Sequence, residues 1–136
     1  MNIKFKLAAA LPLLCLLTTT MAVAADGAGR EIATAAAHAE MAAAAGIDMA
    51  HAHLHHVINC LVGPKGRGFD AAAGNPCKGM GDGALNDSGH SPAVRAQLEE
   101  ALRIADRALR SNKAEELHRD AVKIADVLKG AQAPVK

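Results

Sequence analysis

The feature that most constrains the fold is a glycine-rich segment at residues 62–91, which separates two stretches of strong helical periodicity. The segment holds most of the chain's 12 glycines and few large apolar residues, so it continues neither pattern. A structureless connection of about thirty residues is unusual in a compact domain unless it is functional or tied down. The sequence therefore predicts two helical units joined by a long crossover loop.

The first helical stretch divides into two predicted helices. Residues 30–45 are rich in alanine, which has the highest helix propensity, and carry a narrow stripe of small side chains that favours close packing. Gly46 and Asp48 then predict a tight turn, although one continuous helix through Gly46 is an alternative. A second helix is indicated by apolar residues at the spacing of one helical face, namely Ala50, Leu54, Val57, Ile58 and Leu61.

The second helical stretch also divides into two. Ser91 and Pro92 predict a helix start, with a capping serine followed by proline at the first helical position. The apolar stripe loses its phase near Asn112, where a capping box from Asn112 to Glu115 predicts a new helix start. The last helix is expected to end near Gly130.

The two halves resemble one another in the register of their apolar stripes. Ile32 corresponds to Leu98 at one offset, and Ala50 corresponds to Leu117 at an offset one residue larger. Two similar helical hairpins would bury these stripes together. The predicted fold is therefore all-α, a four-helix bundle of two hairpins joined by the glycine-rich crossover loop. The alternative is two long helices in one hairpin that dimerises.

The N-terminus has the pattern of a secretory signal peptide at residues 1–25. Lys4 and Lys6 precede an apolar run, and small residues follow at positions 22–25. The run is too short for a convincing membrane span, although an uncleaved anchor is an alternative. We expect a single helical domain at residues 26–136, located in the periplasm, with no stable membrane insertion after cleavage.

Charge and composition argue against two classes of function. The chain has 15 basic and 14 acidic residues, and loss of Lys4 and Lys6 with the signal leaves it nearly neutral. Near-neutrality and the absence of Trp and Tyr argue against a nucleic-acid-binding surface. No nucleophile with a base and an orienting group, and no paired carboxylates, can be located in the sequence, so we expect that the protein is not an enzyme.

Two cysteines, Cys60 and Cys77, remain after the predicted cleavage. In an oxidising compartment such a pair favours a disulfide, with thiolate metal ligation as the alternative. A bridge would tie the first half of the loop to the end of the second helix. On loop-closure entropy it would contribute about 3 kcal/mol.

Residues 49–60 concentrate potential metal ligands, with four histidines, a methionine and a cysteine. A helix sorts them onto two flanks: Met49, His53, His56 and Cys60 on one, and Asp48, His51, His55 and Asn59 on the other. Two imidazoles spaced i and i+4 can reach one ion from consecutive turns. The alternative is that these are solvated polar residues on the outer face of the helix.

The predicted metal ligands form three groups. Neutral imidazoles prefer copper, nickel and zinc, and thioethers add a preference for Cu(I), so copper is the first choice. Because the histidines must be neutral to bind, affinity should fall below about pH 6. The ligands are, in order, His51 and His55 with His118 as a third if the second hairpin packs alongside, then His53 and His56 with Met49, and then His38 with Met41 if the first hairpin closes.

The chain resembles the periplasmic small metal-binding protein family, whose members are secreted helical bundles with alanine-rich hairpins and recurrent histidines. The resemblance runs through Ala37-His38-Ala39-Glu40-Met41, through residues 51–61, and through residues 101–128 with His118. It implies binding of divalent metals such as copper, nickel or zinc without catalysis.

The leading functional hypothesis is a periplasmic metal-binding protein that acts as a buffer, scavenger or chaperone for divalent or cuprous ions. One alternative is a bundle that binds haem noncovalently through a histidine pair or a histidine and a methionine. Another is a structural or interaction module of the envelope, in which the glycine-rich loop docks a partner. The sequence identifies no protein partner.

Overall fold

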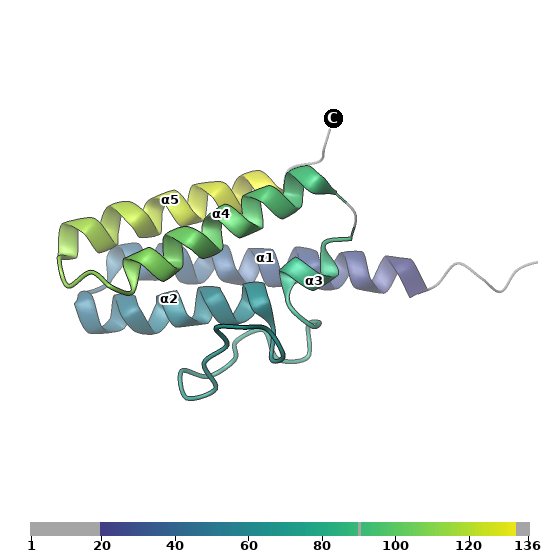
Figure 1. The fold of residues 1–136 in the computed structure, drawn as a ribbon, viewed down its shortest axis with the longest axis horizontal. Helices are drawn as coiled ribbons and strands as arrows, with labels where there is room; N and C mark the ends of the chain where they lie inside the picture. Colours follow the sequence, from purple (N-terminus) through teal and green to yellow (C-terminus); the bar gives the residue numbers. More distant parts are fainter. Residues whose placement is uncertain (1–19, 90, 133–136) are drawn as a thin grey trace, which may run out of the picture.

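The computed structural model describes residues 20–89 and 91–132, with side chains from Gly27 onward (Figure 1). All regular secondary structure in these residues is helical, which confirms the predicted fold class. The predicted signal peptide falls mainly on residues 1–19, outside this description. The helices are α1 (Thr20–Ala44), α2 (Ile47–Val62), α3 (Ala84–Asp87), α4 (Pro92–Ala108) and α5 (Ala114–Gln132).

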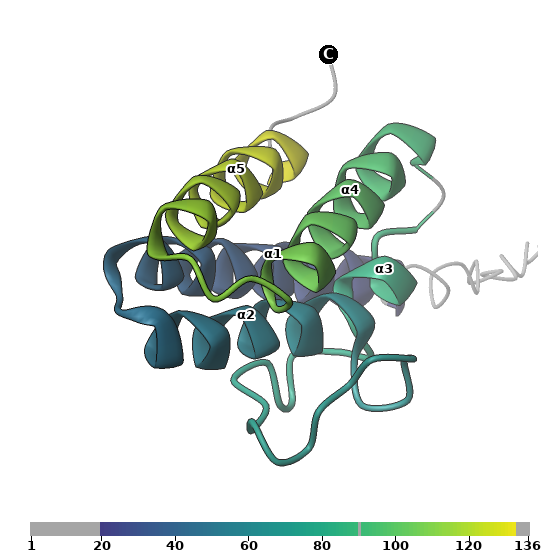
Figure 2. The same ribbon diagram turned by 60° about the vertical axis from the view of Figure 1, so that its left-hand side comes forward.

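The four longer helices pack as a bundle of two hairpins. Helices α1 and α2 form the first hairpin, and α4 and α5 form the second. The hairpins join because α1 packs against α5 and α2 packs against α4 (Figures 1 and 2). No helix of the described residues is long and apolar enough to cross a membrane.

The alanine stripe of α1 faces the core of the bundle. Ala35, Ala39 and Ala42 are almost completely buried, and their small side chains allow neighbouring helices to approach closely. The rest of the core comes from larger side chains on the other helices. The largest of these that are fully buried are Leu54, Ile58, Leu61, Leu98, Ile104, Leu117, Ile124 and Leu128.

The predicted helices form, although α1 begins at Thr20, before the predicted stretch at residues 30–45. The predicted tight turn between α1 and α2 is confirmed, and the alternative of a continuous helix through Gly46 is not formed. Gly46 itself occupies the N-cap, and Asp48 lies in the first turn, where its charge complements the helix dipole. The predicted capping box from Asn112 to Glu115 is also not formed. Instead the hydroxyl of Ser111 donates to a Glu116 carboxylate oxygen at 2.7 Å.

The predicted start of α4 is confirmed. The Ser91 hydroxyl accepts a hydrogen bond from the Val94 backbone amide at 3.4 Å, and Pro92 is the first helical residue. Proline suits this position because its missing N–H would have no partner in the helix.

Both halves of the crossover loop are attached to the helical bundle. Cys60 and Cys77 form the predicted disulfide, with Cα atoms 5.3 Å apart, and both residues are buried. The second half of the loop also returns to the end of α2. There Gly63 has a φ of 69°, and a Cβ atom on this residue would lie 1.8 Å from the Asp82 carbonyl oxygen. Glycine is therefore required at this crossing. The loop also contains one helical turn, α3, which was predicted as irregular.

A buried carboxyl group holds the second half of the loop. Glu31 of α1 is 1% exposed, and its Oε1 accepts a hydrogen bond from the Gly83 backbone amide at 2.9 Å. Its Oε2 has no hydrogen-bond partner among the described residues. Burial, and to a lesser degree the negative charge of Asp87, raises the pKa of Glu31 to about 7. Glu31 therefore keeps its proton well above the usual pH range of a carboxyl group.

Candidate metal centre

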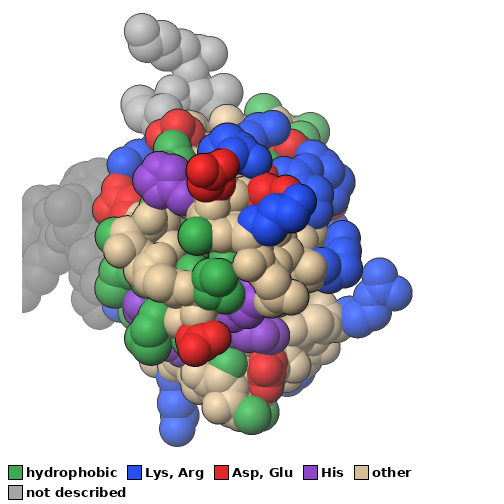
Figure 3. All heavy atoms as spheres, turned by 90° about the vertical axis from the view of Figure 1, so that its left-hand side faces the viewer, with side chains coloured by type: hydrophobic (Ala, Val, Ile, Leu, Met, Phe, Trp, Pro, Cys, Tyr) green, Lys and Arg blue, Asp and Glu red, His purple; other side chains and the backbone are tan. Residues whose placement is uncertain are grey.

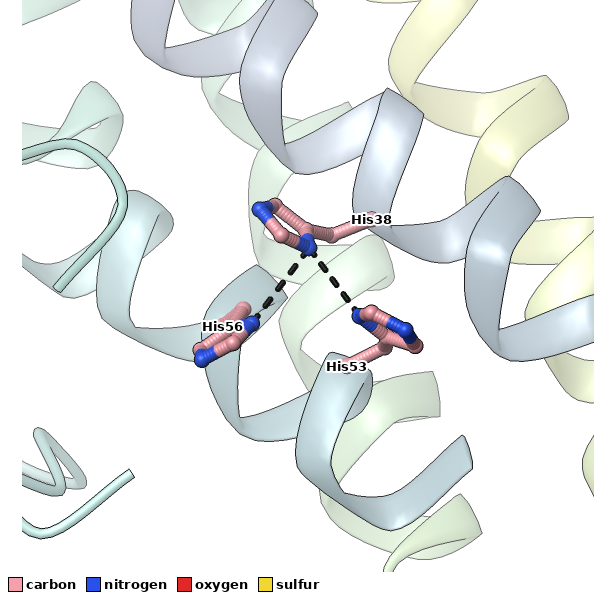
Figure 4. Close-up of side chains that lie close together, drawn as sticks. All are labelled: His38, His53 and His56. Atoms are coloured by element: carbon pink, nitrogen blue, oxygen red, sulfur yellow. Dashed lines mark hydrogen bonds between the residues drawn. The ribbon is translucent and has the colours of Figure 1, made fainter. Parts of the chain in front are cut away.

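Three histidines from two helices converge on one point in the first hairpin. His38 lies on α1, and His53 and His56 lie three residues apart on α2, so both α2 rings face the α1 ring (Figure 4). All three are partly buried. Residues three apart on a helix share a face, and the closely packed alanine stripe of α1 brings His38 opposite them.

In the three-histidine group of His38, His53 and His56, the distances between ring nitrogens are similar to those between ligand atoms around one metal ion. His38 Nδ1 lies 3.2 Å from His53 Nδ1 and 3.4 Å from His56 Nδ1 (Figure 4). One ligand atom from each residue lies within 4.8 Å of the other two. Among the described residues, no other three His, Cys, Asp or Glu side chains meet this condition.

A backbone carbonyl fixes the tautomer of His56. His56 Nε2 lies 2.7 Å from the Ala73 carbonyl oxygen in the crossover loop. A carbonyl oxygen only accepts hydrogen bonds, so Nε2 must carry the hydrogen. A neutral imidazole has one N–H group, which leaves His56 Nδ1 with a free lone pair directed at His38. This arrangement, in which the second ring nitrogen is held by a carbonyl, is the usual support of a metal-binding histidine.

The environment of the group keeps the imidazoles of His38 and His53 neutral. Burial lowers the pKa of His38 to about 4, and the neighbouring rings of His56 and His53 lower it as well. Burial followed by the influence of His56 lowers the pKa of His53 in the same direction. Neutral imidazoles are the form that binds a metal ion. The loss of binding that ordinary histidines predict below about pH 6 should therefore occur at a more acidic pH.

Two of the nitrogen spacings in the group fit a small tetrahedral ion. With metal–nitrogen bonds of roughly 2.0–2.1 Å and tetrahedral angles, two ligand nitrogens stand about 3.3 Å apart. The two Nδ1–Nδ1 distances at His38 are 3.2 Å and 3.4 Å. A single proton shared among three converging nitrogens cannot satisfy all of their lone pairs, whereas a cation can. The three histidines therefore form a group that could hold a metal ion.

Two of the predicted ligands, His51 and His118, bind backbone carbonyls instead of lying in this group. His51 Nε2 is 2.8 Å from the Ser111 carbonyl oxygen, just after α4. His118 Nδ1 is 2.8 Å from the Ala43 carbonyl oxygen, at the end of α1. His118 therefore binds a carbonyl group in the last turn of α1, and His51 binds a carbonyl group in the turn between α4 and α5. The end of the bundle that carries these turns shows histidine among acidic and basic side chains (Figure 3).

The remaining predicted ligands, His55, Met49 and Met41, are not members of the three-histidine group. His55 Nδ1 is 3.5 Å from an Asp70 carboxylate oxygen in the loop. Met49 is 57% exposed and Met41 is 41% exposed. Each methionine is about one helical turn from a member of the group, Met41 from His38 and Met49 from His53.

The sequence pattern separated the two flanks of α2 and ranked His51 and His55 first, whereas the structure brings His53 and His56 together with His38. The division of α2 into two flanks agrees with the structure, in which His53 and His56 point together while His51 and His55 point elsewhere. His38 was predicted to join only if the first hairpin closed, and α1 and α2 do pack together. The Ala73 carbonyl was missed because a backbone group leaves no signal in the sequence.

Comparison with protein-family models, with curated proteins and with solved structures finds no match for this chain. Of the predicted resemblance, the structure supports an all-helical bundle with a group of three histidines that could hold a metal ion.

Proposed function

We propose that this chain is a periplasmic metal-binding protein that holds one transition-metal ion on His38, His53 and His56. Its role would be to buffer, scavenge or deliver the ion rather than to catalyse a reaction. The observation that carries this proposal is the convergence of three imidazoles, one of which has its Nε2 held by the Ala73 carbonyl. The disulfide supports an oxidising compartment.

The ligand set favours Cu(I) or Zn(II) over Cu(II) and Ni(II). Nitrogen spacings near 3.3 Å suit tetrahedral or three-coordinate ions, whereas Cu(II) and Ni(II) prefer square-planar or tetragonal sites. Met41 and Met49 are exposed, and each lies about one helical turn from a histidine of the group, so their thioethers are candidates for a soft fourth ligand. Because thioethers select cuprous copper, we place Cu(I) first and Zn(II) second.

Partial exposure of the site suits exchange of the ion. All three histidines are partly buried, so a bound ion would keep one side towards solvent. A structural zinc site is instead enclosed by four protein ligands. An open three-ligand site therefore fits a protein that takes up an ion and passes it on.

The test is calorimetric titration of the protein with Cu(I), Zn(II), Cu(II) and Ni(II), with the cuprous titration done anaerobically in a competing chelator. We expect a single site for Cu(I) or Zn(II), weakened roughly 100-fold or more by His38→Gln. The matched control is His118→Gln, which removes a histidine bound to a carbonyl and should leave the affinity within about threefold.

Two results would overturn the proposal. Failure of every ion to bind more tightly than about 10 μM would exclude a metal-binding role. Equal effects of His38→Gln and His118→Gln would exclude this site. A parallel titration with haem, followed by absorbance, distinguishes the haem-binding alternative because stoichiometric binding would produce a shifted Soret band.

A further inference from the structure

A buried asparagine holds a short segment of the crossover loop, residues 70–74, against α2. Asn59 is 1% exposed, and its side-chain amide donates to the Asp70 carbonyl at 2.7 Å and to the Gly74 carbonyl at 2.6 Å. Its Oδ1 accepts from the Asp70 backbone amide at 2.8 Å. The side chain therefore binds both ends of the segment and satisfies three backbone groups.

The segment that Asn59 holds carries the carbonyl that fixes His56. Ala73 lies one residue before Gly74, and its carbonyl oxygen is 2.7 Å from His56 Nε2. Gly74 has a φ of 90°, and a Cβ there would lie 3.8 Å from His56 Nε2. Asn59 is three residues after His56 on α2, so both side chains reach the same segment from one side of the helix.

Two further contacts limit movement of the segment. The Asp70 carboxylate accepts a hydrogen bond from the backbone amide of Ala72 at 2.9 Å, which stabilises the turn within the segment. The Cys60–Cys77 disulfide anchors the loop beyond Gly74 to the residue that follows Asn59. The carbonyl of Ala73 is therefore held before any ion arrives.

We infer that Asn59 and residues 70–74 are a positioning element for the three-histidine site. By holding the Ala73 carbonyl in place, Asn59 keeps the hydrogen of His56 on Nε2 and its Nδ1 lone pair directed at the ion. This inference rests on the proposed function and gives the first half of the glycine-rich loop a role in it. Loss of such outer contacts typically weakens metal binding 10- to 100-fold.

The test compares Asn59→Ala with Asn86→Ala. Asn86 also holds the loop, through a hydrogen bond to the Asp82 carbonyl at 2.9 Å, but does not contact the residue 70–74 segment. We expect Asn59→Ala to weaken Cu(I) or Zn(II) binding roughly 10- to 100-fold and Asn86→Ala to change it less than about threefold. Circular dichroism checks that both variants keep their helices.

The tautomer of His56 provides a readout that a purely structural role would not change. In the metal-free wild type, ¹⁵N chemical shifts should show His56 with its hydrogen on Nε2, and Asn59→Ala should shift it towards a mixture. If Asn59→Ala does not fold, Gly74→Ala tests the same segment, because alanine is strained at a φ of 90°.

The outcomes separate this inference from the proposed function. A wild-type His56 with its hydrogen on Nδ1, or a folded Asn59→Ala variant with unchanged tautomer and affinity, would overturn the inference while metal binding stands. A wild type that binds no ion would overturn the proposed function and, with it, the role in metal binding. The effect of Asn59 on the metal-free tautomer would then show whether the positioning contact itself exists.

Discussion

The two helical hairpins share their apolar register but differ in the polar groups that bridge their helices. In the register that aligns Ile32 with Leu98 and Ala50 with Leu117, the three-histidine group falls on different residues in the second hairpin. The counterparts of His38, His53 and His56 are Ile104, Asp120 and Lys123.

In the second hairpin, oppositely charged side chains form ion pairs between α4 and α5. Asp120 accepts two hydrogen bonds from Arg107, at 3.1 Å and 2.5 Å, and Lys123 lies 3.7 Å from a Glu100 carboxylate oxygen. In such ion pairs the charged groups satisfy one another, so no added ligand is needed. The histidines of the first hairpin have no opposite charge within their group, and they could hold a metal ion. Two of the three corresponding positions therefore form ion pairs in the second hairpin, whereas in the first hairpin all three are histidines of the candidate site.

The hairpins also share one reciprocal contact. His51 near the start of α2 binds the Ser111 carbonyl after α4, and His118 near the start of α5 binds the Ala43 carbonyl at the end of α1. His51 and His118 correspond in the register of the two halves. The histidine that recurs in both hairpins therefore joins them, and three of the four histidines found only in the first hairpin form the candidate site.

The largest expected effect comes from giving the first hairpin the polar residues of the second. The double variant His53→Asp, His56→Lys should weaken Cu(I) or Zn(II) binding roughly 1,000-fold, about 4 kcal/mol, because two ligands are lost and a positive charge enters the site. Calorimetry measures this loss. The matched variant Asp120→Asn, Lys123→Gln should retain the full affinity, and an equal loss there would remove the distinction between the hairpins.

The disulfide is the next largest difference, since the described part of the second hairpin has no counterpart to it. Replacing Cys60 and Cys77 together with alanine should lower the free energy of unfolding by about 3 kcal/mol, because the bridge restricts the unfolded chain. Urea denaturation measures this change. An unchanged urea midpoint would mean that the remaining contacts of the loop hold it without the bridge.

The pH dependence of stability should reflect Glu31 and His38, whose pKa values are shifted in opposite directions. The pKa of Glu31 is raised from 4.5 to about 7, so the folded state keeps an extra proton and stability falls as pH rises through that window. The pKa of His38 is lowered from 6.5 to about 4, so stability falls as pH drops through that window.

Glu31→Gln should therefore remove the decrease on the alkaline side and stabilise the protein at pH 8 by roughly 2 kcal/mol relative to its effect at pH 4.5. Urea denaturation at both pH values provides the comparison, with the exposed carboxyl variant Glu115→Gln as control. A Glu31→Gln effect that does not change with pH would show that the buried carboxyl group does not titrate in this range.

The smallest expected effect concerns the reciprocal contacts. His51→Ala and His118→Ala should each lower the free energy of unfolding by about 1 kcal/mol, the usual net value of one hydrogen bond. Neither should change the metal affinity by more than about threefold. A large loss of affinity from His51→Ala alone would move the candidate site towards the opposite flank of α2.

Much of the bundle could be predicted from local sequence. The apolar spacing of Leu54, Val57 and Ile58 and the start of α4 at Ser91 and Pro92 depend on propensity and periodicity within a few residues. The capping box at Asn112 was wrong because several polar residues compete at that turn, and packing selected Ser111 with Glu116. The local sequence pattern does not determine which of several neighbouring polar residues forms the hydrogen bond at the start of a helix.

The sequence by itself determined that four helices form two hairpins, that Cys60 and Cys77 can pair, and that α2 carries histidines on two flanks. These properties follow from residue type and helical period. Only the tertiary structure decided which flank gains a third ligand, because His38 meets His53 and His56 through the packing of α1 on α2. It also decided which ring nitrogen is free, because the Ala73 carbonyl reaches His56 only when the loop folds back onto the helix.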